Sequence, residues 1–358
     1  MAFRFELGET FLTGIPRIAR ENISSVITLL SEKPRPTAES VHEARKSLKS
    51  LRAVLQLARG GIESEFQHRE NLLFRDTGRS LSAARDPQAL LEALDRIAKS
   101  HGTRTRRPTA KQMAERSLIS EIRREINQQL LRQLRHEPVQ DLVKELQNAK
   151  VRTASWLQGI LLQPGNEWEI LIGTGLRKTY RKARNLVSQI ERPGPQSASD
   201  ETWHELRKCA KALGYQLRLL EPVWPAALGT LIDEIDELTS RLGDANDLAV
   251  LQRKVREIGA SNQDKDELVR REFMRSIERR KQKLRFRALK YARIIYSEKP
   301  GQFERRLAGY WQIWRTKRPA PKFGIIENND GPGKGPGSKA NPEFLPVASN
   351  NHHVHYKL

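Results

Sequence analysis

The sequence has only one cysteine, Cys209, among its 358 residues, and only 6% of its residues are aromatic. A single cysteine forms no intramolecular disulfide and builds no cysteine-ligated zinc cluster, so neither supports the fold. The apolar neighbours Leu206, Ala210 and Leu213 predict that Cys209 is a small core residue rather than a reactive thiol. The shortage of aromatic rings argues against a protein that stacks unpaired bases on exposed side chains.

Long apolar runs are missing as well. No segment approaches the roughly 20 apolar residues of a membrane-spanning helix, and residues 1–20 lack the apolar centre of a secretory signal. A protein that binds a membrane surface would need large exposed apolar side chains opposite its basic face, and only Trp311 and Trp314 are candidates. We therefore expect a cytoplasmic protein with no membrane partner.

Acidic residues are too few to balance the basic ones. The chain has 64 lysines and arginines against 43 aspartates and glutamates, which gives a formal net charge of +21. Such an excess makes compaction more costly through self-repulsion, and it is typical of proteins with a polyanionic partner. Nucleic acid, an anionic membrane surface and inorganic polyphosphate all fit this charge.

The sequence is rich in helical periodicity. Apolar residues recur three and four positions apart in segments 41–57, 206–220 and 273–295, which is the spacing of an apolar stripe on an amphipathic helix. The alternation of apolar and polar residues that is typical of a β-strand occurs only in residues 3–7. The sequence therefore predicts an all-α fold.

Local signals predict where helices begin and where the folded part ends. Ser40-x-x-Glu43 predicts a capping box at the start of one helix, and Asp200 is a predicted N-cap of another. From about residue 319 the composition changes to Pro, Gly, Asn and Ser, which predicts a disordered tail over 319–358. The tail's histidines, His352, His353 and His355, are assigned to this flexible segment, and we predict no metal site and no cofactor.

The chain also repeats itself. Segments 14–20, 42–51 and 81–90 match, in the same order and at nearly the same offset, segments 175–181, 204–213 and 242–251. The strongest match is His-Glu-x-Arg-Lys-x-x-Lys-x-Leu, which begins at His42 and again at His204. Three anchors in one register predict a tandem duplication of a multi-helix unit, with a seam near 155–170.

Basic residues lie beside the apolar stripes of four predicted helices, with few acids between them. A solvated face usually mixes charges of both signs, whereas like charges three and four residues apart weaken a helix slightly. One such stripe would be explained by solvation alone. Four stripes, two of them with a histidine at the same place, favour a surface selected to bind an anion.

These motifs resemble the CHAD family, the conserved histidine α-helical domain. The resemblance covers about residues 1–318 and rests on the two histidine segments, with Tyr215 after the second, on Leu242-Gly243-Asp244-x-Asn246-Asp247, and on Gly175-Leu176-Arg177-x-x-Tyr180-Arg181. It implies two pseudo-symmetric four-helix bundles, from about 1–160 and 161–318, with basic helices lining a central groove or pore that takes polyphosphate. It also implies association with polyphosphate granules.

The stripes and the resemblance together give the candidate polyphosphate-binding residues. They are Arg17, Arg20, His42, Arg45, Lys46, Lys49, Arg52, Arg177, Lys178, Arg181, Arg184, His204, Arg207, Lys208, Lys211, Tyr215, Arg218, Arg279, Arg280 and Lys283. Polyphosphate offers no base edges to recognise and needs only closely spaced lysines and arginines, with arginine able to bind phosphate oxygens bidentately. We expect the two histidines to donate hydrogen bonds to phosphate.

Two other interpretations stay open at this point. One is a basic helical protein that binds nucleic acid, although the sequence shows no recognition helix for duplex bases. The other is a polyphosphate-processing enzyme that uses His42 and His204. The zinc-protease pattern His-Glu-x-x-His is incomplete, because Lys46 and Lys208 occupy its last position, and the chain has no P-loop and no Glu-x-Glu-x-Lys triphosphatase motif. We expect a binding protein without catalytic activity.

Overall fold

The structure is a computed structural model that describes residues 3–32, 36–81, 86–100, 109–133, 139–160, 162, 166–261 and 267–316. All of them belong to one compact unit, Met1–Pro319. The second unit, Ala320–Leu358, lies outside the described residues. The predicted tail over 319–358 and its three histidines are therefore left as a prediction.

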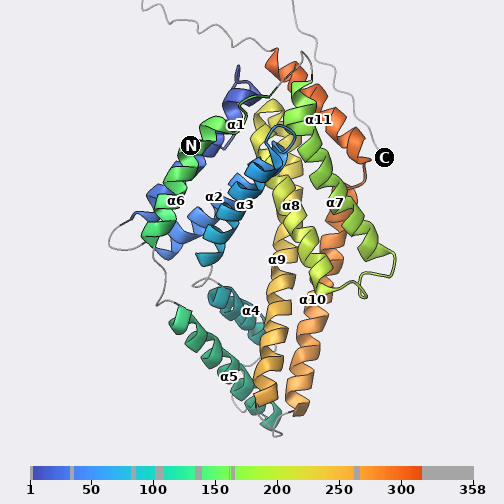
Figure 1. Cartoon of the computed structure of the whole chain (residues 1–358). Coiled ribbons are helices and arrows are strands. Elements are labelled where there is room, and N and C mark those ends of the chain that lie inside the picture. Colours follow the sequence, from blue (N-terminus) through green and yellow to red (C-terminus); the bar gives the residue numbers. More distant parts are fainter. Residues whose placement is uncertain are drawn as a thin grey trace, which may run out of the picture. The chain divides into compact units, whose positions relative to one another are not determined.

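The described residues form helices and no strand, which confirms the predicted all-α fold (Figure 1). The short segment 3–7 is not a strand. The short helices are η1 (Thr153–Ser155), η2 (Glu169–Gly173) and η3 (Glu221–Val223). The α-helices are α1 (Phe11–Leu30), α2 (Ala38–Leu57), α3 (Ser64–Ser80), α4 (Asp86–Ser100), α5 (Ala110–Gln133), α6 (Val139–Arg152), α7 (Thr174–Glu191), α8 (Asp200–Leu220), α9 (Pro225–Ser261), α10 (Glu267–Ile295) and α11 (Pro300–Arg315).

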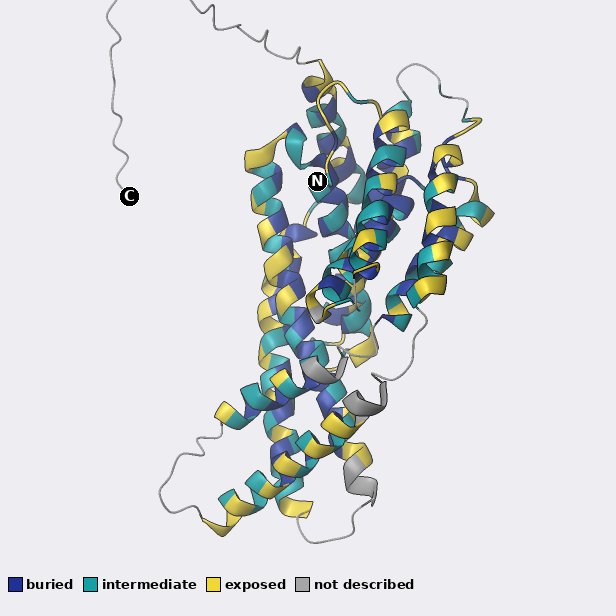
Figure 2. Ribbon diagram, turned by 90° about the vertical axis from the view of Figure 1, so that its left-hand side faces the viewer, coloured by how far each residue is buried: buried dark blue, intermediate teal, exposed yellow. Residues whose placement is uncertain are grey.

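Two hydrophobic cores hold these helices together. The larger core takes apolar residues from α1, α2, α7, α8 and α11 and from parts of α9 and α10. The smaller core joins α4 and α5 to the remaining parts of α9 and α10, which reach both cores (Figure 1). Burial follows the predicted apolar stripes, with buried positions on the inner helix faces and exposed positions on the outer faces (Figure 2). The position of Cys209 in the larger core is as predicted, and burial raises the pKa of its thiol.

Both predicted helix starts are displaced in the structure. Thr37, rather than Ser40, is the N-cap of α2, and its hydroxyl accepts a hydrogen bond from the Ser40 backbone N–H at 3.0 Å. Ser199 is the N-cap of α8. A serine or threonine lies within one turn of each predicted start, and either can cap a helix, so the local pattern did not determine which one does.

Asp200 has a different role, which is to hold α8 against α10. Its Oδ1 accepts hydrogen bonds from Arg285 Nη2 at 2.6 Å and from Lys281 Nζ at 3.2 Å. The Lys281 and Arg285 side chains are only 6% and 3% exposed, and buried cations of this kind need a carboxylate partner. Burial opposes ionisation of Asp200, but the hydrogen bond from Arg285 and the charge of Lys281 keep its pKa below the ordinary value. The network fixes the start of a helix that lines the candidate site.

Glycine permits a close helix contact near the site. A Cβ on Gly175 in α7 would lie 2.1 Å from the carbonyl oxygen of Leu57, the last residue of α2. Only glycine lets the two backbones approach this closely. The contact packs α7 against one side of α2, and the basic side of α2 lines the site.

The two tryptophans considered for membrane contact are buried. Trp311 stacks on Phe11 with ring centroids 4.0 Å apart, and Trp314 packs beside Trp311 in the larger core. They are therefore core residues and not available for contact with a membrane. Among the described residues, no helix is long and apolar enough to cross a membrane.

Candidate functional site

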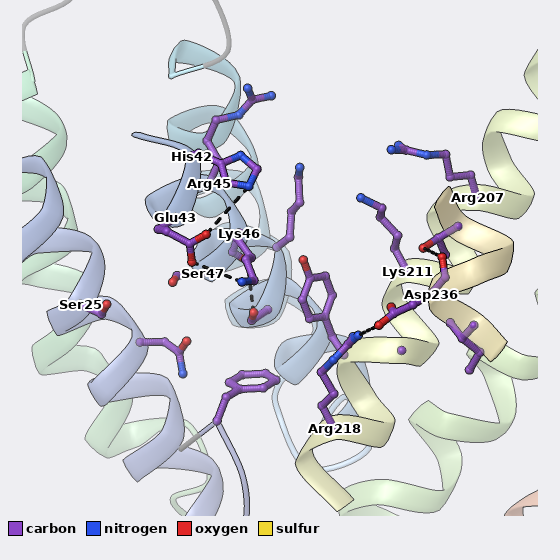
Figure 3. Close-up of a pocket in the computed structure, with 18 of the residues that line it drawn as sticks. Ser25, His42, Glu43, Arg45, Lys46, Ser47, Arg207, Lys211, Arg218 and Asp236 are labelled. Atoms are coloured by element: carbon purple, nitrogen blue, oxygen red, sulfur yellow. Dashed lines mark hydrogen bonds and ion pairs between the residues drawn. The ribbon is translucent and has the colours of Figure 1, made fainter. Parts of the chain in front are cut away.

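A cavity of about 790 Å³ lies between α1, α2, α8 and α9 (Figure 3). The two copies of the histidine motif approach it from different helices, because α2 carries the first copy, α8 carries the second, and the two helices pack together. The residues lining it that were predicted from the sequence are His42, Arg45, Lys46, Lys49, Arg207, Lys211, Tyr215 and Arg218. The structure thus gathers side chains that are far apart in the sequence.

The α2 wall follows from helix geometry. His42, Arg45, Lys46 and Lys49 are spaced three or four residues apart, so they share one face, while Ala44, Leu48 and Leu51 turn into the core. Glu43 lies among them: its Oε2 is 3.3 Å from Lys46 Nζ, and its Oε1 is 3.9 Å from His42 Nε2 (Figure 3). The Glu43 carboxylate thus holds the Lys46 and His42 side chains beside the cavity.

The α8 wall carries Arg207, Lys211, Tyr215 and Arg218. The Arg218 guanidinium forms an ion pair with Asp236 of α9 and lies 5.8 Å from the centre of the Tyr215 ring. Burial raises the pKa of Tyr215 above its ordinary value, so its hydroxyl keeps its proton at neutral pH and can donate it to an anion.

Positive charge predominates around the cavity. Counting only the described residues, six lysine or arginine side chains and four carboxylates line it. The carboxylates are Glu21, Glu43, Asp236 and Asp247. A concave site with excess cations raises the local concentration of anions and shields them from bulk water. The arrangement can hold an anionic chain from several sides.

His204, unlike His42, is not part of the cavity lining. Its Nδ1 lies 3.0 Å from Oδ1 of Asn246 on α9, and because an amide oxygen only accepts, the imidazole donates this hydrogen bond. Asn246 lines the cavity. The two histidines, although they occupy equivalent positions in the repeats, are therefore placed differently: one faces the cavity and the other supports a residue that does.

Asp247 completes the wall formed by α9. Burial raises the pKa of Asp247 against the opposing charges of Arg207 and Arg96. Nη2 of Arg96 on α4 lies 3.9 Å from Asp247 Oδ2 and 3.4 Å from Asp244 Oδ1, so these ion pairs connect α4 to the α9 wall. The Leu242–Asp247 motif found in the sequence therefore lies against the second histidine motif.

Gly243 leaves room for the Arg207 side chain. A Cβ on Gly243 would lie 3.1 Å from Arg207 Nη2 and 3.3 Å from Nε, so the guanidinium would have to move. Because Gly243 is inside α9, alanine also favours the helix by about 1 kcal/mol. We expect Gly243→Ala to raise the melting temperature and to weaken anion binding severalfold, measured by thermal unfolding and isothermal titration calorimetry.

Gly229→Ala is the matched control for that change, because it lies on the same helix and a Cβ there would have nothing within 4 Å. It should raise stability to a similar extent and leave anion affinity unchanged. Equal affinities for the two variants would show that the placement of Arg207 over Gly243 has no part in binding.

Several other predicted residues are engaged away from the cavity. Arg17 Nε donates to Glu9 at 2.6 Å, Arg52 Nε donates to Asn71 at 3.0 Å, and Lys208 pairs with Glu205. Burial opposes ionisation of Glu205, but hydrogen bonds from Lys208 and Lys182 lower its pKa to about 2. Arg20 is exposed on α1 and does not line the cavity.

The α7 and α10 candidates are also outside the cavity lining. Arg177 lies 3.5 Å from Glu304, and Arg184 donates to the carbonyl oxygen of Ser297 at 2.8 Å. Lys178 and Arg181 are exposed on α7. Arg279, Arg280 and Lys283 lie on α10, and none of them lines the cavity.

The sequence analysis did not select the remaining cavity residues. Four of them lie on the basic helices α2 and α8: Glu43, Ser47, Ser50 and Gly214. The others are Phe3, Glu21, Asn22, Ser25, Ala89, Ile235, Asp236 and Thr239. One of them, Asp236, could have been suspected as a partner for Arg218, but only the packing of α8 on α9 shows that the two meet. Among the described residues, no group of three or more histidine, cysteine or acidic side chains is placed to hold a metal ion.

A family model of known proteins matches the chain over the segments that carry the motifs. No curated protein matches the chain. Among solved structures, it is similar to the crystal structure of the CHAD domain from the plant Ricinus communis, with 19% sequence identity, a TM-score of 0.49, and coverage of 83% of this chain and 93% of that one. The family model of the CHAD domain matches residues 26–256, more than half of the 358 residues. The chain therefore belongs to the CHAD domain family.

Proposed function

We propose that this chain binds inorganic polyphosphate in the cavity between α2 and α8 and does so without catalysis. The observation that carries the proposal is the convergence of the two basic motifs, since Arg45 and Lys49 from α2 and Arg207 and Lys211 from α8 line the same cavity. The CHAD family is linked in general to polyphosphate binding.

The chemistry of the walls suits a chain of phosphates. Arginine can bind two oxygens of a phosphate at once, whereas lysine acts as a compact charge that can follow a flexible polymer. Neutral donors, such as the Tyr215 hydroxyl and the Asn246 amide, can bind oxygens that the cations do not reach. Stacking platforms for bases are not needed for such a ligand.

The carboxylates of the cavity have a supporting role in this proposal. Glu43 and Asp236 hold Lys46 and Arg218 in place before the ligand arrives. A side chain that is already ordered loses less conformational entropy on binding, which favours affinity. Phosphate oxygens would then share these cations with the carboxylates. This arrangement retains the polymer rather than cleaving it, so we expect no release of orthophosphate, and a cytoplasmic location on polyphosphate granules fits such retention.

A competition experiment tests the proposal. Labelled long-chain polyphosphate bound to the full chain is challenged, at fixed physiological salt, with unlabelled polyphosphate, single-stranded RNA and duplex DNA. We expect polyphosphate to displace the label at far lower phosphate concentration than either nucleic acid, because only the flexible polymer can place successive phosphates within the cavity. Equal displacement by RNA would favour a nucleic-acid-binding protein. Phosphate release on incubation would favour an enzyme.

A further inference from the structure

A row of basic residues follows the outer face of α10, away from the cavity. Arg275, Arg279, Lys283, Arg287 and Lys290 are spaced three or four residues apart, so they lie on one side of the helix. All five are exposed, and none lines the cavity. We call this row the α10 stripe. At 1.5 Å per residue, it extends over roughly 22 Å.

The α10 stripe is not neutralised by acids of the described chain. None of its five cations has a carboxylate within ion-pair distance among the described residues, although other α10 cations do: Arg271 pairs with Glu267 and Arg293 with Glu191. Glu272 is an acidic residue at the beginning of the same face, but its Oε2 pairs with Lys111 Nζ of α5 at 2.5 Å rather than with a cation of the stripe. Cations spaced in this way repel one another, and an external anion would relieve that repulsion.

Large apolar side chains are exposed within the same face. Phe286 is 54% exposed and Ile294 is 71% exposed, and they lie beside Arg287 and Lys290. Lys290 Nζ is 5.4 Å from the centre of the Phe286 ring. Charge alone does not explain these two residues, since a polyphosphate or nucleic-acid backbone would gain nothing from an exposed isoleucine. Large apolar side chains beside lysines and arginines suit the surface of an anionic bilayer, where the apolar groups can enter among the headgroups while the charges stay at the lipid phosphates.

We propose, against the expectation from the sequence of no membrane partner, that the α10 stripe is a docking surface for an anionic lipid bilayer. The cations contact lipid phosphates, while Phe286 and Ile294 enter the boundary between headgroups and acyl chains. All five cations of the stripe lie on one side of a single helix, so they can contact a flat surface at the same time. The cavity, by contrast, is lined by several helices. Only one aromatic residue, Phe286, interrupts the five cations, which is too few to stack successive bases of single-stranded RNA.

Vesicle co-sedimentation of the full chain tests this proposal without involving polyphosphate. We expect the protein to bind vesicles of phosphatidylcholine with phosphatidylglycerol and not vesicles of phosphatidylcholine alone. The triple variant Arg279→Gln, Lys283→Gln, Arg287→Gln should reduce partitioning roughly a hundredfold, because each basic side chain near an anionic surface contributes about a fivefold effect. The variant Phe286→Ser, Ile294→Ser keeps every charge and should still weaken binding at least severalfold.

The matched control removes three exposed cations elsewhere, with Arg20→Gln on α1, Arg79→Gln on α3 and Lys144→Gln on α6. It has the same net charge as the triple variant and should bind vesicles like the unaltered chain. An equal loss in this control would attribute binding to net charge and overturn the proposal. Unchanged partitioning of the Phe286→Ser, Ile294→Ser variant would also overturn it. Loss of polyphosphate binding in the triple variant, with no vesicle binding by the unaltered chain, would assign the stripe to the polymer instead.

Discussion

Replacing Arg45, Lys49, Arg207 and Lys211 together with glutamine is expected to reduce polyphosphate affinity by about a thousandfold or more. The four side chains represent two-thirds of the lysines and arginines that line the cavity in the described part of the chain. Each charge-assisted hydrogen bond to phosphate contributes about 1.5–3 kcal/mol, so the loss from both walls is large even if the contributions overlap. Isothermal titration calorimetry at fixed salt measures the change.

The control for this variant removes the same charge from other exposed positions. Arg79, Lys144, Arg253 and Arg256 are exposed and none of them lines the cavity. Changing these four to glutamine should weaken binding only by the small long-range effect of net charge. Circular dichroism should show equal helicity for both variants. A loss of helicity in the cavity variant alone would mean that the four residues support the fold, and an equal loss of affinity in both would argue against a localised site.

Polyphosphate affinity is expected to fall several hundredfold as monovalent salt rises from about 50 to about 200 mM. The nearest guide is the single-stranded nucleic-acid slope of about −0.7 per neutralised phosphate, which for six cavity cations predicts a slope near −4 on logarithmic axes. The measurement is a series of titrations at increasing salt. The glutamine variant of the cavity should retain only about one-third of the slope, because it retains two of the six cations. A salt-insensitive affinity would contradict binding through the cavity cations.

The sequence predicted the helices more fully than the site. Apolar spacing determined which side of α2 and of α8 turns inward, and the positions of the cations on the same helices followed from that. The repeated motif also predicted that the segments around His42 and His204 form similar amphipathic helices. These predictions depend on residues within a few helical turns, where spacing and geometry are directly related.

The remaining part of the site depends on contacts that spacing does not encode. Arg17 and Arg177 have the same local pattern as the cavity cations, but Glu9 and Glu304 are placed by other segments and engage them. The sequence predicted the same role for both histidines, but only His42 lines the cavity. His204 instead contacts Asn246, and only the packing of α8 on α9 brings these two residues together. The packing of distant segments, rather than local spacing, decided which cations line the cavity.

The two hydrophobic cores give the described chain two cooperative regions of unequal strength. Each fully buried leucine or isoleucine contributes about 1.5–3 kcal/mol, so the larger core, with more such residues, opens less readily than the one that holds α4 and α5. Since α4 supplies Ala89 to the cavity lining and its Arg96 pairs with Asp247 of the α9 wall, separation of α4 and α5 would expose that side while α2 and α8 stay packed together. The middle of a long polymer could then enter sideways, without one of its ends having to thread through the protein.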